Sequence, residues 1–129
     1  MLPFGRIVLA ARALWELCRY DLVAATSGFQ GVHRKLQGLA CGRRSSRSGM
    51  ETVVLRTVAA MSSFYWKPVL CLQRSVVTVR LLRQYGIAAQ VVIGCRTAPF
   101  ASHAWVEVNG RVVNDSPGYQ QKLRVLERF

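Results

Sequence analysis

The sequence predicts an α+β fold in which helices come first and a small antiparallel sheet follows. Before Gly86, apolar residues recur at three- and four-residue intervals, which is typical of amphipathic helices. After Gly86 the apolar runs are short, and Asn109-Gly110 between two of them is a strong hairpin signal. Because 129 residues is a common length for one compact unit, we expect a single domain over 1–129, in which residues 1–65 are helical and basic.

The first helix is expected over residues 7–22. Its predicted inward face consists of Ile7, Ala10, Ala11, Leu14, Leu17 and Cys18, and its outer face carries Arg6, Arg12 and Arg19. Thr26-Ser27-Gly28 should interrupt the helix before a second short helical stretch around Val32–Leu39. The run Cys41–Gly49, rich in Gly, Ser and Arg, is the best loop candidate.

Two further helices are expected in the middle of the chain. One covers Glu51–Phe64, where Glu51 suits a helix N-terminus and the inward stripe is Val54, Leu55, Val58 and Met61. The other runs through Leu70–Tyr85, with Pro68 in its first turn and Gly86 as its stop. Its predicted inward stripe is Leu72, Val76, Val79 and Leu82 or Arg83.

Three strands are expected in the last third. Ala88–Gly94 reads as a central strand, with Cys95 just past its end, and His103–Val108 and Arg111–Asp115 form a hairpin. A two-residue turn at Asn109-Gly110 would place His103 and Asp115 on opposite faces of the sheet. A three-residue loop with a glycine bulge would pair them directly and set Glu107 opposite Arg111. We therefore predict the bulged register.

Composition and charge exclude several classes of protein. Half of the residues are apolar (51%) and 19% are charged, which excludes a disordered chain. Charges interrupt the most apolar stretch, so neither a membrane span nor a secretory signal is predicted, and we expect a cytoplasmic protein. The four cysteines and two histidines lack the spacing of a zinc site, so we expect no metal and no other cofactor.

The net charge of +12 indicates an anionic partner. Fifteen of the eighteen basic residues are Arg, including a local cluster in Arg43-Arg44-Ser45-Ser46-Arg47. Nucleic acid is disfavoured because the sequence has no pattern of alternating basic and aromatic residues and no helix-turn-helix signature. An acidic peptide or protein would fit the charge equally well, and so would a solvated surface that is simply rich in Arg.

A cysteine, a histidine and an aspartate form the strongest catalytic candidate. Cys71 falls in the first turn of a predicted helix, where backbone N–H groups and the positive end of the dipole favour a thiolate. His103 begins a strand and can serve as its base, and Asp115 ends the next strand and can orient the imidazole. Singly, each could be a structural residue, but the coincidence of all three favours catalysis.

The oxyanion hole of such a site is harder to identify. The backbone N–H of Cys71 is one expected donor, and a side chain should supply another. Trp66 and Gln73 are both candidates for this second donor. The alternatives are a buried indole for Trp66 and a solvent-exposed helix residue for Gln73.

The residues around this trio resemble a known family. The motifs that carry the resemblance are Cys71-Leu72-Gln73-Arg74-Ser75, Leu81–Ile87 (LLRQYGI), Val91–Gly94 (VVIG), Pro99–Val108 (PFASHAWVEV) and Asn114-Asp115. Together, over residues 66–126, they resemble the transglutaminase-like leader peptidases of lasso-peptide maturation. The resemblance implies a papain/transglutaminase-like catalytic core over 66–129, with the Cys at a helix N-terminus packed on a small antiparallel sheet.

The resemblance further implies a cysteine protease that removes the leader from a ribosomally made lasso-peptide precursor. Cys71 would be the nucleophile, His103 the base and acid, and Asp115 the orienting group. The expected partners are the precursor's leader region, a small leader-recognition protein, since no room is expected for a fused recognition domain, and an ATP-dependent macrocyclase. Two alternatives stay open: an acyl or amide transferase that uses the same triad, and a catalytically inactive basic binding module.

Overall fold

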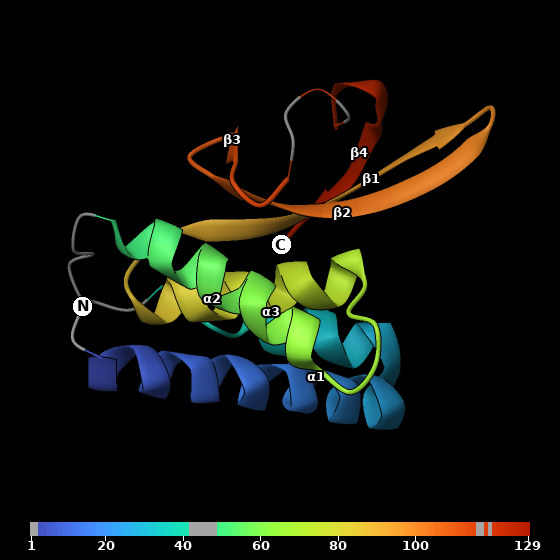
Figure 1. The fold of residues 1–129 in the computed structure, drawn as a ribbon. Coiled ribbons are helices and arrows are strands. Elements are labelled where there is room, and N and C mark those ends of the chain that lie inside the picture. Colours follow the sequence, from blue (N-terminus) through green and yellow to red (C-terminus); the bar gives the residue numbers. More distant parts are fainter. Residues whose placement is uncertain (1–2, 42–48, 116–117, 119) are drawn as a thin grey trace.

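The computed structural model describes residues 3–41, 49–115, 118 and 120–129, and it has the predicted α+β architecture (Figure 1). The elements in chain order are α1 (Pro3–Gln37), α2 (Met50–Phe64), α3 (Cys71–Gln84), β1 (Ala89–Thr97), β2 (Phe100–Val108), β3 (Arg111–Val112), a 3₁₀ turn (Gln120–Lys122) and β4 (Arg124–Arg128). The strands form one antiparallel sheet in the order β3-β2-β1-β4, and the helices lie together on one side of it. The predicted loop Cys41–Gly49, with its arginine cluster, lies outside the described residues except at its two ends.

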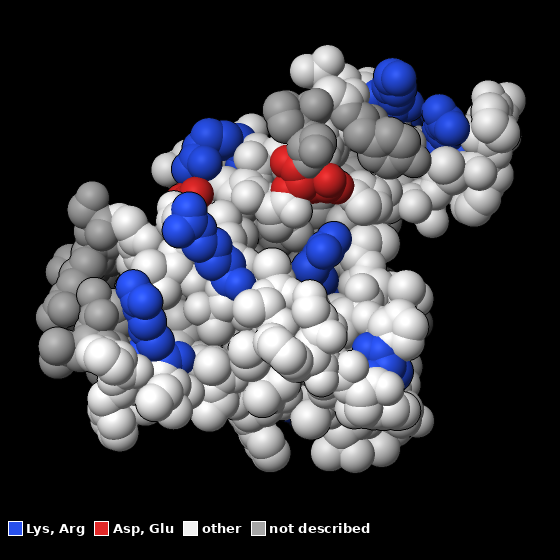
Figure 2. All heavy atoms as spheres, viewed as in Figure 1, with Lys and Arg blue, Asp and Glu red and all other residues white. Residues whose placement is uncertain are grey.

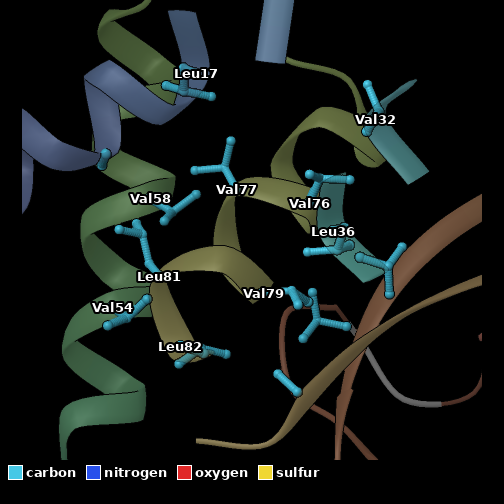
Figure 3. Close-up of a cluster of buried hydrophobic side chains, with 14 of the residues drawn as sticks. Leu17, Val32, Leu36, Val54, Val58, Val76, Val77, Val79, Leu81 and Leu82 are labelled. Carbon is cyan, nitrogen blue, oxygen red and sulfur yellow. The ribbon is translucent and has the colours of Figure 1, made fainter. Parts of the chain in front are cut away.

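Helix α3 is the centre of the core. It contacts α1, α2, β1 and β2. Because neighbours surround it, α3 buries residues on nearly every side, including Val76, Val77, Val79, Leu81 and Leu82, and not only the predicted stripe. Figure 3 shows that apolar side chains of α1 and α2 converge on this helix.

The boundaries of α2 and α3 follow the sequence closely. In α2, Val54 and Val58 are fully buried as predicted, and Glu51 lies in the first turn. Helix α3 begins one residue later than expected: Leu70 is its N-cap, so Pro68 precedes the helix and does not lie in its first turn. Gly86 follows the helix with a φ of 80°, a left-handed conformation that suits a glycine helix stop.

The inward face of α1 was predicted correctly at Leu17, but Ile7, Ala11, Leu14 and Cys18 are exposed. Leu9, Ala13 and Leu17 are fully buried, whereas Ile7 is 67% exposed and Leu14 is 37% exposed. In this orientation Glu16 also faces inward, and its carboxylate is 2.6 Å from the guanidinium Nε of Arg80 on α3. The spacing of apolar residues along a helix cannot reveal that a charged residue belongs to its buried face. The predicted interruption is confirmed at Gly28, whose φ of 65° breaks the helical path.

This orientation of α1 leads to a stability prediction. Replacing Leu9 by Ala should lower the free energy of unfolding by about 2–5 kcal/mol, because the substitution leaves a cavity in the core. Leu22 lies on the same helix and is 65% exposed, so Leu22→Ala is the matched control and should cost less than about 1 kcal/mol. Chemical denaturation of both variants measures the difference, and equal losses would contradict the orientation of α1.

The hairpin register also differs from the prediction. Glu107 pairs with Val112 and Val108 with Arg111, so the turn has two residues and no bulge. Asn109 and Gly110 have φ values of 52° and 76°, which is the left-handed pair that a type I′ turn requires. Glu107 therefore does not lie opposite Arg111, and the Arg111 guanidinium instead makes two hydrogen bonds of 3.1 Å to Glu51 on α2.

The sheet is longer than the sequence indicated. Strand β1 is interior, as predicted, but it continues to Thr97, so Cys95 lies within it and not past its end. Strand β3 covers only two residues, and β4, which pairs with β1, was not predicted. The ends of β1 and β2 around residues 97–100 extend beyond the helices (Figure 1).

The two faces of the sheet carry separate apolar clusters. Val91, Val106 and Val108 pack against the helices, and Val92, Trp105 and Leu123 pack together on the opposite face. Gly94 lies under the Trp105 ring, where an added Cβ would be 2.7 Å from the ring, so only glycine fits there. No helix in the described ranges is both long enough and apolar enough to cross a bilayer.

Candidate active site

Cys71 is the first residue of α3, so it lies in the first turn of the helix, where the sequence predicted it. Its side chain is half-buried, and the N-cap residue Leu70 makes no side-chain hydrogen bond to the first turn. The first backbone N–H groups of a helix have no partner within the helix, and the dipole places positive potential there. At this position the backbone N–H of Cys71 can face an oxyanion.

His103 and Asp115 are in contact. The imidazole Nε2 of His103, on β2, is hydrogen-bonded to the Asp115 carboxylate, and both side chains are half-buried. The ring also stacks on Trp105 at 6.2 Å between centroids, with 25° between the planes. The carboxylate therefore faces Nε2 and can hold the orientation of the ring.

The side chain of Asn114 explains how Asp115 reaches His103. The sequence prediction made this contact depend on a bulged hairpin, and that requirement was wrong. Beyond β3, Val113 N–H still donates to the Val106 carbonyl at 3.0 Å. The next acceptor for β2 is a side chain: Asn114 Oδ1 accepts from Val106 N–H at 2.8 Å. The backbone thus leaves the ladder at Asn114, and Asp115 is released from the strict alternation of faces.

Asn114 also ties this segment to the helix that carries Cys71. Its Nδ2 donates to Ser75 Oγ at 3.4 Å. Ser75 is four residues after Cys71, so both lie on the same face of α3, about 6 Å apart along the axis. The structure therefore joins the segment before Asp115 to the Cys71 face of α3, which itself packs on β2, the strand of His103.

The two oxyanion candidates have environments opposite to the alternatives considered for them. Gln73 is buried, and its Nε2 donates to the Leu17 carbonyl of α1 at 3.1 Å. Trp66 is 78% exposed and lies near Lys67, whose ammonium is 5.7 Å from the ring centroid. Gln73 thus joins α3 to α1, and neither side chain has a contact that assigns it to an oxyanion.

A polar cluster beside the start of α3 was not found from the sequence. Asp21 on α1 accepts a hydrogen bond from the Tyr65 hydroxyl, and its other carboxylate oxygen is 2.6 Å from Lys67 Nζ. Burial, followed by the neighbouring charges of Asp21 and Cys71, raises the pKa of Tyr20. Asp21 is 44 residues from Tyr65, so no local motif could have indicated the cluster. It fixes the segment between α2 and α3 that leads into Cys71.

The Asp21 cluster should make the free energy of unfolding depend on pH in the acidic range. Burial acts to raise the pKa of Asp21, but hydrogen bonds from Lys67 and Tyr65 outweigh it and leave the pKa below its ordinary value of 3.8. A carboxyl with a lowered folded-state pKa stabilises the fold above its unfolded pKa, and this stabilisation is lost as pH falls through the folded value. Asp21→Asn should therefore cost about 1 kcal/mol or less at neutral pH.

The measurement is chemical denaturation from about pH 6 down to about pH 2. The difference between the original chain and Asp21→Asn should shrink as the pH falls below the ordinary carboxyl range. A difference that stays constant over this interval would show that the Asp21 carboxylate contributes no charge-dependent stability.

The setting of Cys71 predicts selective alkylation. Cys18 and Cys41 are exposed, whereas Cys71 and Cys95 are half-buried, so exposure alone would favour the first two. A thiolate reacts with iodoacetamide much faster than a thiol does. We expect Cys71 to be labelled first near neutral pH, as read by peptide mass spectrometry. Faster labelling of Cys18 and Cys41 would show that exposure, and not thiolate character, controls reactivity.

A metal centre receives no support from the geometry. Within the described stretches of the chain, no three His, Cys, Asp or Glu side chains gather in a way that could hold an ion.

Comparison with known proteins identifies the family. The family model of the transglutaminase-like superfamily matches residues 14–128, nearly the whole chain. The chain belongs to the transglutaminase-like superfamily. This match takes in most of α1 and all of α2, so it extends well beyond the motif-bearing segment 66–126.

One curated relative is closely similar over a stretch of this transglutaminase-like chain. The microcin J25-processing protein McjB of Escherichia coli is 50% identical over 56 residues, which is 43% of this chain. The chain spans about a quarter (27%) of the length of McjB. No solved structure matches significantly.

Proposed function

We propose that this protein is a cysteine peptidase that removes the leader peptide from a lasso-peptide precursor. The observation that carries the proposal is the contact between His103 and Asp115, in a segment joined to the helix that begins at Cys71. Cys71 is the nucleophile, His103 the base and acid, and Asp115 the group that orients the imidazole. These are the groups that a thiol needs to cleave an amide.

The proposed reaction has two steps. The Cys71 thiol gives its proton to the His103 imidazole, and the thiolate sulfur attacks the scissile carbonyl carbon while the Cys71 N–H stabilises the oxyanion. The C–N bond breaks as the imidazolium of His103 protonates the leaving amine, which leaves the leader as a thioester on Cys71. His103 then takes a proton from water, the resulting hydroxide attacks the thioester, and the C–S bond breaks to release the leader as a carboxylic acid.

The substrate assignment draws on the similarity to McjB, which is named as a processing protein for microcin J25, and on the motifs around Cys71 and His103. The protein would act in the cytoplasm. A leader-recognition protein would deliver the precursor, and an ATP-dependent macrocyclase would use the new N-terminus. The net charge of +12 suits a partner or substrate segment that carries acidic groups.

The test is to incubate the chain with a candidate precursor and its recognition protein and to read the product masses. Hydrolysis yields a free leader whose carboxyl terminus contains one oxygen from water, so a reaction in H₂¹⁸O labels the leader. Acyl transfer to an amine yields a conjugate without that label. An intact precursor after long incubation with the complete partner set would count against the peptidase, and an unlabelled conjugate would favour the transferase.

A further inference from the structure

A pocket of about 250 Å³ lies between α2, α3 and the chain just after β3. The pocket is lined by Leu55, Arg56, Ala59, Arg74, Thr78 and Asn114, among others. None of these residues belongs to the proposed Cys71–His103–Asp115 trio, but Asn114 is adjacent to Asp115. The pocket is large enough for one side chain of a peptide together with a short length of its backbone.

Two guanidinium groups give the pocket its charge. Arg74, on α3, is half-buried, and its Nε is a buried donor with no hydrogen-bond partner among the described residues. Arg56, on α2, also lines the pocket and is exposed. A buried donor without a partner is costly and therefore uncommon in native proteins. A ligand that accepts a hydrogen bond from Arg74 would remove this cost.

The side-chain carboxylates of the protein are all engaged elsewhere. The sequence contains six Asp and Glu residues, and all six lie in the described ranges. Each one has a cationic or histidine partner: Glu16 with Arg80, Asp21 with Lys67, Glu51 with Arg111, Glu107 with Arg128, Asp115 with His103 and Glu127 with His33. Figure 2 shows the resulting imbalance, with basic side chains spread across this face and acidic ones in far fewer places. A carboxylate that pairs with Arg56 and Arg74 would therefore come from another molecule.

The position of the pocket along α3 relates it to the proposed nucleophile. Arg74 and Thr78 follow Cys71 by three and seven residues, which corresponds to about 4.5 and 10.5 Å along the helix axis. An extended peptide advances about 3.3 Å per residue. A peptide that is held at Cys71 and runs along α3 would place a side chain two or three residues from the cleaved bond beside this pocket.

We infer that the pocket binds the carboxylate of an Asp or Glu side chain in the peptide substrate. The inference rests on the proposed peptidase function for its placement near the cleaved bond. The guanidinium groups of Arg74 and Arg56 hold the carboxylate. The Asn114 side-chain amide has a second N–H beside the one that it donates to Ser75, and this N–H can be a further donor. The apolar wall of Leu55 and Ala59 packs on the short aliphatic stem of the acidic residue, which distinguishes an amino-acid carboxylate from a free inorganic anion.

The experiment measures binding without cleavage. The Cys71→Ala chain is labelled with ¹⁵N and titrated with acetyl-Leu-Glu-Leu amide and, separately, with its Gln analogue, while NMR follows the arginine Nε–Hε signals. The Glu peptide should bind about tenfold more tightly, because a hydrogen bond to a charged group is stronger than one to a neutral amide. The Nε–Hε signal of Arg74 should shift the most.

Three variants distinguish binding of the carboxylate in this pocket from attraction to the overall positive charge of the protein. Arg74→Gln and Arg56→Gln should each remove most of the preference for Glu over Gln, and Arg56 is exposed, so its variant should not disturb the fold. Arg124→Gln removes the same charge from an exposed position on β4 and should keep the preference. Equal binding of the two peptides, or an equal loss in Arg124→Gln, would overturn the inference.

The two proposals fail separately. If the peptides bind as expected but no precursor is ever cleaved, the pocket stands and the peptidase function does not. If the precursor is cleaved but the Glu peptide has no advantage over the Gln peptide, the peptidase function stands and the carboxylate site does not.

Discussion

Replacing Cys71 by Ala should reduce leader removal to the background rate. The thiol sulfur is the atom that forms the covalent bond in the proposed mechanism, and loss of a triad nucleophile typically costs a factor on the order of 10⁶ in kcat. The side chain is half-buried at the first position of α3 and is absent from the apolar core around that helix. The fold should therefore persist, as checked by circular dichroism and thermal unfolding.

The matched control is Cys95→Ala. Cys95 is also half-buried but lies within β1, away from any helix start. This variant should retain most of the cleavage rate. Cleavage that persists in Cys71→Ala, with the fold intact, would rule out Cys71 as the nucleophile, and equal losses in both variants would indicate a structural cause.

Removal of the Asp115 carboxylate should have the second-largest effect. In Asp115→Ala the His103 ring loses the carboxylate at Nε2, so its orientation becomes less defined. General acid–base catalysis contributes about 10²–10⁴-fold, and we expect kcat to fall by an amount in that range with little change in KM. Steady-state kinetics on the precursor measures the two constants.

Asp115→Asn refines this prediction, because an amide oxygen can still accept a hydrogen bond from Nε2–H without supplying a charge. Its kcat should lie between those of the original chain and Asp115→Ala. Glu127→Ala is the control, because Glu127 also contacts a histidine ring. Its Oε1 is 2.5 Å from Nε2 of His33, which lies on α1 and not in the proposed trio. A loss in Glu127→Ala as large as that in Asp115→Ala would mean that carboxylate–histidine contacts act through stability alone.

The helices and the site residues differ in how far a sequence pattern can reach. The boundaries of α2 and α3 depend on local signals, such as Glu51 in the first turn and Gly86 after the last, and these were predicted to within one or two residues. The inward face of α1 includes Glu16, whose partner is Arg80 of α3, 64 residues further along the chain, and a local pattern does not reveal a partner at that distance. Strand β4 is likewise defined by its pairing with β1 and has no strong pattern of its own.

The residue types and their order along the chain were enough to predict the α+β class, a helix with Cys71 in its first turn, and His103 and Asp115 as partners. The sequence could not reveal how His103 and Asp115 come into contact, because the contact depends on the tertiary hydrogen bonds of Asn114. Its side chain bonds to Val106 of β2 and to Ser75 of α3, and the backbone therefore leaves the hairpin ladder before Asp115. The same is true of the pocket between α2 and α3. The positive charge of its two arginines, Arg56 and Arg74, is not neutralised because the six side-chain carboxylates pair with other residues. Those pairings form only when the chain has folded.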